Sequence, residues 1–226
     1  MIKTIIFDFD GTIIDTNTLI EEGLNHFALR YRGSTLNKNE HKFLVGKTLE
    51  DQMSFISETH KHSMTEQFKI WYKHHHNQKA KAFPQMIELI HGLKQLGYQL
   101  AIVSNNSTQS VSHGLKHLKL DTYFDYILTR DHVSEVKPSP EGLEVILTFT
   151  ESRTHEAIFV GDAATDVQAA KSAGLKSVLV GWSHLDVDDI HKLEPDYVIS
   201  SALQLLTVIE SINESNKQIY QKRIAV

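Results

Sequence analysis

Apolar residues follow two different patterns along this chain. After about residue 84, short continuous apolar runs alternate with segments in which apolar residues recur every three or four positions. The first pattern predicts β-strands and the second predicts helices. The predicted strands are Ile2–Phe9, Tyr98–Val103, Tyr126–Thr129, Ala157–Val160, Ser177–Val180 and Tyr197–Ile199. The predicted helices include Met86–Leu96, Ser107–Leu118, Pro140–Phe149, Asp166–Ala173 and Ala202–Ile212.

This alternation indicates the fold class. Strands that alternate with helices of this length are typical of βαβ units and a parallel sheet. The strand runs are too continuously apolar for a sheet with one face in water, so we expect helices on both faces. The sequence therefore predicts an α/β protein with a Rossmann-like, doubly wound parallel sheet as its core.

Residues 15 to about 82 break the alternation. They show helical periodicity and almost no strand signal, which predicts an all-helical insertion. We expect a helical domain at 16–82, inserted into a Rossmann-like core formed by 1–15 and 83–226, with junctions near Asp15–Thr16 and Ala82–Pro84. The polar residues from Asn213 onward are expected to be poorly ordered.

Composition excludes several classes of protein. The 226 residues are 41% hydrophobic, enough for one α/β core and a smaller domain, and the net charge of −5 argues against a nucleic-acid binder. The absence of cysteine excludes disulfides, zinc thiolates and cysteine nucleophiles. No apolar run approaches the roughly 20 residues that cross a bilayer. We expect a cytoplasmic protein with no membrane partner, and either a monomer or a weak dimer.

Candidate chemistry begins at the end of the first predicted strand. Asp8 and Asp10 lie two positions apart, so their side chains point to the same side of the strand. Two carboxylates placed together repel each other, and a bound cation is the usual compensation. Gly11 follows at once.

Three further signals lie at or just beyond the carboxyl ends of later strands, where ligands bind in open α/β sheets. Ser104 and Asn105 offer a hydroxyl and backbone N–H groups at a strand-to-helix turn, a suitable phosphate cradle. Lys137 lies in a proline-stiffened loop. Asp162 and Asp166 add two more carboxylates, although Asp166 could instead cap a helix.

The charges of these residues indicate a metal. Four aspartates against one lysine would repel a phosphate dianion, whereas a Mg²⁺ would bring the local charge close to neutral and assist phosphoryl transfer. Hard oxygen ligands favour Mg²⁺ over zinc or copper.

The four segments resemble, in order, the four motifs of the haloacid dehalogenase-like phosphohydrolase superfamily. The insertion is similar to the cap of its phosphoglycolate-phosphatase-like branch, and the resemblance extends from Ile2 to about Ser200. It implies an aspartyl-phosphate formed on Asp8, with Asp10 as acid and then base. The other implied roles are phosphate binding by Gly11, Thr12, Ser104, Asn105 and Lys137, and Mg²⁺ binding by Asp8, Asp10, Asp162 and Asp166.

Two features of the insertion invite a functional interpretation. The glycine loop with Gly46 and Lys47 could reach the site when the cap closes, or could be a simple turn between helices. Consecutive residues on a helix point about 100° apart, so the tract His74–His76 cannot converge on one ion and is expected to be a solvated helix face.

The leading hypothesis is a Mg²⁺-dependent phosphatase for a small phosphorylated metabolite such as phosphoglycolate. An inorganic pyrophosphatase of the same family stays open. The segment that returns from the insertion to the core, Trp71–Pro84, resembles that of both the phosphatase and the pyrophosphatase subgroups, so it does not separate them.

A phosphosugar mutase is disfavoured because Gly161 precedes Asp162 where mutases typically carry Glu-Asp. A haloalkanoic-acid dehalogenase is also disfavoured, because those enzymes lack the second aspartate of the first motif and Asp10 is present here. Their reaction has no leaving group that needs a proton. A response-regulator receiver would be about half this length. A family member that only binds ligands would be expected to lack a motif residue, and none is missing from this sequence.

Overall fold

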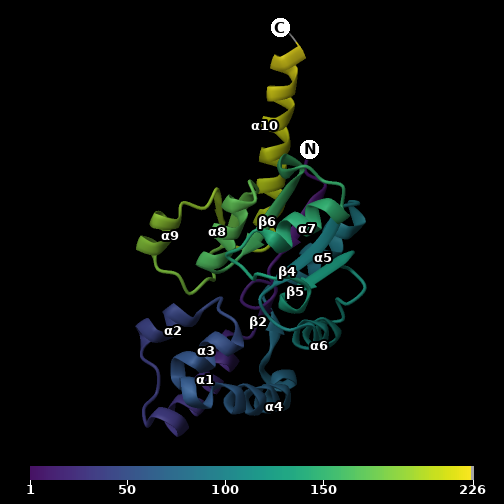
Figure 1. Cartoon of the computed structure of the whole chain (residues 1–226). Coiled ribbons are helices and arrows are strands. Elements are labelled where there is room, and N and C mark those ends of the chain that lie inside the picture. Colours follow the sequence, from purple (N-terminus) through teal and green to yellow (C-terminus); the bar gives the residue numbers. More distant parts are fainter. Residues whose placement is uncertain (225–226) are drawn as a thin grey trace.

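Six parallel strands form the central sheet of the protein (Figure 1). The computed structural model describes residues 1–224 and the side chains of 1–76 and 79–218. The strand order is β5-β4-β1-β6-β7-β8. Their bounds are β1 Thr4–Phe7, β4 Gln99–Ser104, β5 Tyr126–Thr129, β6 Ala157–Gly161, β7 Lys176–Val180 and β8 Tyr197–Ile199. All five pairings are parallel, so every strand ends at the same edge of the sheet.

Helices cover both faces of this sheet. Ile5 and Phe7 point to one face and pack with the apolar residues of α5, α6 and α10, whereas Ile6 points to the other and packs with α7 and α8. The bounds of these helices are α5 Met86–Gln95, α6 Thr108–Leu118, α7 Glu141–Phe149, α8 Ala164–Ser172 and α10 Gln204–Ile224, with the short α9 Val187–Leu193 beside α8. The predicted α/β class with a doubly wound parallel sheet is confirmed.

The C-terminal helix is longer than the sequence pattern predicts. Helix α10 continues to Ile224 and extends away from the sheet in Figure 1, beyond the end at Ile212 that the sequence predicts; the expectation of poor order from Asn213 onward stays a prediction. The start of this extension contacts the opposite end of the chain. The Asn213 side-chain oxygen accepts a hydrogen bond of 2.6 Å from the Ile2 backbone N–H. Residues 225 and 226 lie outside the described part of the chain.

Four helices follow the first strand and form a separate helical segment. They are α1 Asn17–Arg32, α2 Lys38–Leu44, α3 Leu49–Ile56 and α4 Lys61–Lys79. Their apolar faces pack together around Phe27, Met53 and Phe68, apart from the two clusters on the sheet. Figure 1 shows this segment beside the edge at which the parallel strands end.

A short antiparallel ribbon joins the helical segment to the sheet. Its strands, β2 Ile14–Asp15 and β3 Lys81–Ala82, pair Ile14 with Ala82 and Asp15 with Lys81. Two residues are too few to produce an alternating pattern, which explains why the sequence shows no strand signal there.

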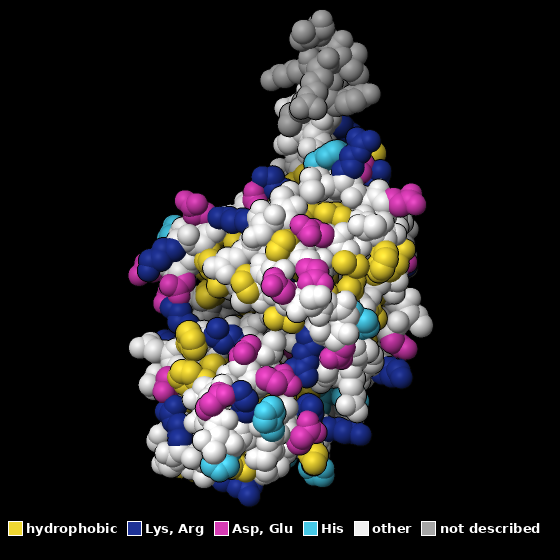
Figure 2. All heavy atoms as spheres, viewed as in Figure 1, with side chains coloured by type: hydrophobic (Ala, Val, Ile, Leu, Met, Phe, Trp, Pro, Cys, Tyr) yellow, Lys and Arg dark blue, Asp and Glu magenta, His cyan; other side chains and the backbone are white. Residues whose placement is uncertain are grey.

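Charged side chains of both signs are interspersed on the face shown in Figure 2. Among residues 1–224, no helix is both long and apolar enough to cross a membrane.

Two helical glycines give a test of the packing beneath the first strand. A Cβ on Gly114 in α6 would lie 2.7 Å from two carbons of the buried Phe9 ring, whereas a Cβ on Gly92 in α5 would meet nothing within 4 Å. We expect Gly114→Ala to cost about 1–3 kcal/mol of stability through overpacking. The matched Gly92→Ala should stabilise the protein by about 0.5–1 kcal/mol. Urea unfolding measures both free energies, and equal stability of the two variants would contradict the tight packing at Phe9.

Candidate active site

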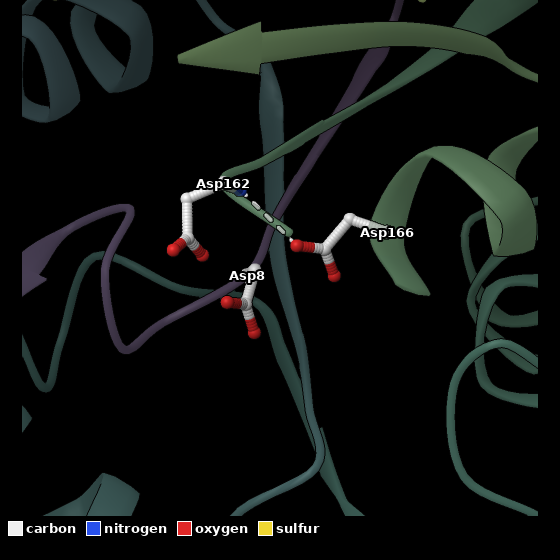
Figure 3. Close-up of side chains that lie close together, drawn as sticks. All are labelled: Asp8, Asp162 and Asp166. Atoms are coloured by element: carbon white, nitrogen blue, oxygen red, sulfur yellow. Dashed lines mark hydrogen bonds between the residues drawn. The ribbon is translucent and has the colours of Figure 1, made fainter. Parts of the chain in front are cut away.

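The candidate site lies where three neighbouring strands end. Because β1 lies between β4 and β6, the residues that follow these strands meet at one edge. Carboxylate oxygens of Asp8, Asp162 and Asp166 lie within 4.8 Å of one another, and all three residues are buried. Figure 3 shows them facing a common space, Asp8 after β1, Asp162 after β6 and Asp166 from the first turn of α8.

A buried lysine connects two of these carboxylates. The Lys137 Nζ lies 2.6 Å from Asp8 Oδ1 and 2.7 Å from Asp166 Oδ1. Burial alone would lower the pKa of Lys137, but the charges of Asp166 and Asp8 outweigh it and hold this pKa above its usual value. The ammonium therefore stays charged and fixes the orientation of both carboxylates.

One lysine does not neutralise three buried carboxylates. Burial is the largest influence on Asp8 and raises its pKa to about 7, against the opposing effect of Lys137. Burial and the charges of Asp8 and Asp166 also raise the pKa of Asp162 well above its usual value. The unbalanced negative charge, provided by hard oxygen ligands, fits a divalent cation such as Mg²⁺.

Asp166 is more constrained than the other two aspartates. Its Oδ2 accepts hydrogen bonds from the backbone N–H groups of Asp162, at 3.1 Å, and Ala163, at 2.9 Å. Its Oδ1 faces Lys137. The N-cap of α8 is Ala163 and Asp166 is the third residue of the helix, so the alternative of Asp166 as the N-cap residue is wrong. Its side chain instead accepts from the N-cap backbone N–H and orders the acidic cluster.

The predicted phosphate-binding residues surround the same edge. Gly11 has a φ of 82°, and a Cβ there would lie 2.3 Å from Asp162 Oδ2, so the turn requires glycine. Thr12 is fully buried, and its hydroxyl lies 3.4 Å from Asp162 Oδ1. The Ser104 hydroxyl accepts a hydrogen bond from the Asn106 backbone N–H.

The side chain of Asn105 connects three loops. Its Nδ2 donates to the carbonyl oxygens of Gly46 and Lys137, both at 2.9 Å, and its Oδ1 accepts from the Lys137 N–H. The amide thus links the loop after β4 to the Lys137 loop and to the helical segment. From the sequence, only the backbone of Asn105 is expected to take part in the site, and nothing in the pattern signals this role of its side chain.

Asp10 lies outside the cluster of three and is only partly buried. The Thr16 hydroxyl donates to its Oδ1 at 2.8 Å, and the Asn106 amide donates to its Oδ2 at 2.9 Å. Tyr72 of α4 lines the same cleft as Asp10. Burial, together with the charge of Asp10, raises the pKa of Tyr72 well above its usual value, so this hydroxyl keeps its proton.

Neither Thr16 nor Tyr72 is predicted from the sequence to be a site residue. Thr16 lies at a predicted domain junction, and Tyr72 follows the apolar residues of a helix, so each matches an ordinary structural position.

A cleft of about 1060 Å³ separates the sheet edge from the helical segment. Asp8, Asp10 and Lys137 line it on one side, and the α2–α3 loop with Gly46 and Lys47 lines it on the other. The Lys47 ammonium lies 4.5 Å from the centre of the Phe43 ring. This loop is therefore both a turn between helices and part of the cleft wall.

The histidine tract differs from expectation at one position. His76 is buried, and the centre of its ring lies 4.9 Å from that of His113 on α6. The expectation of a solvated helix face is therefore wrong for this residue. Among the described residues, only Asp8, Asp162 and Asp166 group closely enough to hold a metal.

The raised carboxylate pKa values predict how a metal affects stability. A group whose folded pKa exceeds its unfolded value stabilises the fold at low pH, and that contribution is lost as pH rises through the folded pKa. For Asp8 this loss occurs between about pH 4 and pH 7. Mg²⁺ binds the ionised carboxylates, so we expect MgCl₂ to raise the melting temperature more at pH 8 than at pH 5.5, at matched ionic strength.

The variant Asp162→Asn tests the same cluster. It removes one repelling charge, so the metal-free variant at pH 8 should melt about 2–4 °C above wild type, as about 1 kcal/mol gives for a chain of this size. The gain from MgCl₂ should largely disappear. Asp121→Asn, at an exposed position, should respond to MgCl₂ as wild type does. A gain from MgCl₂ that is independent of pH and of Asp162 would contradict a metal in this cluster.

Known proteins match this chain over nearly its whole length. Residues 5–180 match the family model for haloacid dehalogenase-like hydrolases. Pyrophosphatase PpaX of Bacillus mycoides is 32% identical over 212 residues, which cover 94% of this chain and 99% of that protein.

Solved structures agree on the fold. A predicted phosphoglycolate phosphatase from Haemophilus somnus superposes with a TM-score of 0.84 at 23% identity, covering 92% of this chain and 98% of that one. A hydrolase from Pseudomonas syringae gives 0.81 at 23% identity, covering 93% and 99%. The prediction of a hydrolytic enzyme is confirmed, because the chain belongs to the haloacid dehalogenase-like hydrolase family.

Proposed function

We propose that the protein is a Mg²⁺-dependent phosphohydrolase that transfers a phosphoryl group to Asp8 and then to water. The observation that carries this proposal is the Asp8 carboxylate, buried at the sheet edge with Lys137 at 2.6 Å and two further carboxylates beside it. Folding gains nothing from such an excess of negative charge, whereas phosphoryl transfer with a metal requires it.

The reaction has two steps. An Asp8 oxygen bonds to phosphorus while the bond from phosphorus to the leaving oxygen breaks, and that oxygen receives a proton from Asp10. Asp10, now ionised, takes a proton from water as the water oxygen attacks phosphorus, and the bond between phosphorus and Asp8 breaks to release phosphate. Bound Mg²⁺ would neutralise charge on the phosphoryl oxygens.

The remaining motif residues would hold the reactants. Asp8 and Asp162, with the Asp10 backbone carbonyl, would ligate Mg²⁺, and Asp166 would do so directly or through water. The Lys137 ammonium would offset charge on Asp8 and on the phosphate. The phosphoryl oxygens would be held by the Ser104 hydroxyl, the Asn105 backbone, Gly11 and Thr12.

We further propose that residues 16–82 act as a cap domain on a core formed by 1–15 and 83–226. The Asn105–Gly46 hydrogen bond and the ion pair of 2.6 Å between Lys42 and Asp186 support a segment seated on the core. A seated cap would exclude bulk water from the aspartyl-phosphate, and Gly46 and Lys47 would contact the leaving group. Cytoplasmic location and a monomer or weak dimer stay predictions.

The substrate class we propose is a small organic phosphate such as phosphoglycolate. Inorganic pyrophosphate is a second candidate, favoured by the 32% identity to a pyrophosphatase over nearly the whole chain. In that case phosphate itself is the leaving group, and the same residues would carry both steps.

Replacing the nucleophile tests the mechanism. We expect Asp8→Asn to lower kcat at least about 10³-fold on every substrate of a panel of organic phosphates and pyrophosphate, because an amide cannot form the acyl phosphate. Removal of Mg²⁺ by chelation should abolish wild-type turnover, and Asp121→Asn should retain it. The ranking of kcat/KM names the preferred substrate.

A direct search for the intermediate completes this test. Acid quench of wild type during turnover of ³²P-labelled substrate should leave label on the protein that hydroxylamine removes, and Asp8→Asn should carry none. Wild-type turnover that persists in Asp8→Asn, or without any divalent metal, would contradict the proposed mechanism.

A further inference from the structure

The Asn105 side chain is hydrogen-bonded to both main-chain polar groups of Lys137. Its Oδ1 accepts from the Lys137 N–H, and its Nδ2 donates to the Lys137 carbonyl oxygen, each at 2.9 Å. The same Nδ2 donates to the Gly46 carbonyl oxygen, also at 2.9 Å. A carbonyl oxygen can only accept and a backbone N–H can only donate, so the two ends of the amide cannot be exchanged. The three partners therefore fix the orientation of this side chain.

Lys137 needs such a partner more than the carboxylates that it contacts. Asp8 directly follows β1, and its N–H donates to the Val160 carbonyl oxygen of β6 at 2.8 Å. Asp166 lies in the first turn of α8. Lys137, in contrast, lies in the loop that precedes α7. Main-chain polar groups that are buried require partners, and those of Lys137 find them in Asn105. The amide thus ties this loop to the end of β4.

The main chain of Lys137 determines where its ammonium group can lie. Because both its N–H and its carbonyl oxygen are held, the direction in which its side chain leaves the loop is restricted. The flexible side chain is buried, and its Nζ lies 2.6 Å from Asp8 Oδ1 and 2.7 Å from Asp166 Oδ1. A shift of the main chain would lengthen at least one of these two short contacts.

Gly46 holds the amide from the helical segment. Its φ is 76°, and a Cβ there would lie 2.6 Å from Thr165 Oγ1 and 3.0 Å from Ala163 Cβ. The loop between α2 and α3 therefore lies directly against the start of α8, while its carbonyl oxygen accepts from Asn105. Asn105 has all three partners only when the helical segment is seated on the sheet part of the chain.

We propose that Asn105 is a positioning residue whose side chain holds Lys137 so that the ammonium group faces Asp8 and Asp166, and that Gly46 holds Asn105 in turn. The proposal rests on the proposed function, in which Lys137 offsets charge on Asp8 and on the phosphate. It concerns the side chain alone. The backbone of Asn105 would contact the phosphate through an N–H that every residue except proline possesses, so a side-chain variant separates the two roles.

The experiment is a double-mutant cycle on kcat/KM, measured with Mg²⁺ on both phosphoglycolate and pyrophosphate. Its variants are Asn105→Ala, Lys137→Met and the two together. We expect Asn105→Ala to lower kcat/KM about tenfold or more, since a misplacement of about 1 Å can cost about 10²-fold. In the Lys137→Met background the same change should cost less than about twofold, because no ammonium group is left to position. A lost phosphate contact or a generally loosened loop would cost the same in both backgrounds.

Asn213→Ala is the matched control. Its side chain also bonds to a backbone N–H, that of Ile2 at 2.6 Å, but at the opposite end of β1 from Asp8. It should change kcat/KM less than about twofold in either background. Melting temperatures check that every variant folds.

Amide hydrogen exchange measured by NMR gives a second readout, which needs neither turnover nor the Lys137→Met variant. Pro138 and Pro140 have no amide hydrogen, so Lys137 and Ser139 are the reporters within 137–140. The Ser139 N–H donates to the Val136 carbonyl oxygen inside the loop at 3.0 Å, whereas the Lys137 N–H donates to a side chain outside it. The Lys137 amide therefore reports the proposed contact.

We expect the Lys137 amide to exchange about tenfold or more faster in Asn105→Ala than in wild type. Gly46→Ala should also speed this exchange, by a smaller factor, because it displaces one partner of Asn105 and leaves the two bonds to Lys137. Asn213→Ala should exchange as wild type does at this amide.

The role of Asn105 would be overturned by a loss of kcat/KM that is equal in both backgrounds, by no loss at all, or by unchanged exchange at Lys137 in Asn105→Ala. Unchanged exchange in Gly46→Ala would overturn the part given to Gly46. None of these results affects the proposed function as long as Asp8→Asn is inactive. Failure of the proposed function would be recognised differently, by wild type that turns over neither substrate or by Asp8→Asn that turns them over normally.

Discussion

The Lys137 ammonium lies between Asp8 and Asp166, and this buried contact organises the rest of the site. Burying three carboxylates with a single ammonium group costs free energy, because the charges lose their contact with water. The backbone must therefore hold these groups in position. Parallel strands provide that support, since β1 and β6 are hydrogen-bonded to each other along their length and both end at this edge. The unbalanced negative charge at this edge fits a divalent cation.

Much of this arrangement is predictable because it depends on local patterns. Continuous apolar runs identify the strands, and Asp8 and Asp162 follow two of these runs directly, so topology alone brings them to one edge. The position of Asp166 in the first turn of α8 is also predictable from a local pattern. An acidic side chain there accepts from a backbone N–H at the helix start and faces the cluster.

The contacts that the sequence does not reveal join residues far apart in the chain. Asn105 meets Gly46 across 59 positions, and His76 is buried because α4 lies against α6. Neither residue type has a preference that signals such a contact, since asparagine is common in turns and histidine is common on surfaces. The contact of α10 with Ile2 is of the same kind, because it spans 211 positions.

The two-residue ribbon of β2 and β3 has a consequence for how the chain can fold. It brings the two ends of the helical segment together at one point, Ile14 against Ala82. For the sheet, the connection from β1 to β4 therefore behaves as a short loop, however many residues lie beyond the ribbon. The entropy of ordering those residues is offset within the segment, by its own apolar cluster around Phe27 and Met53. Helices could be lengthened, shortened or exchanged beyond the ribbon while the register of the six strands stays the same.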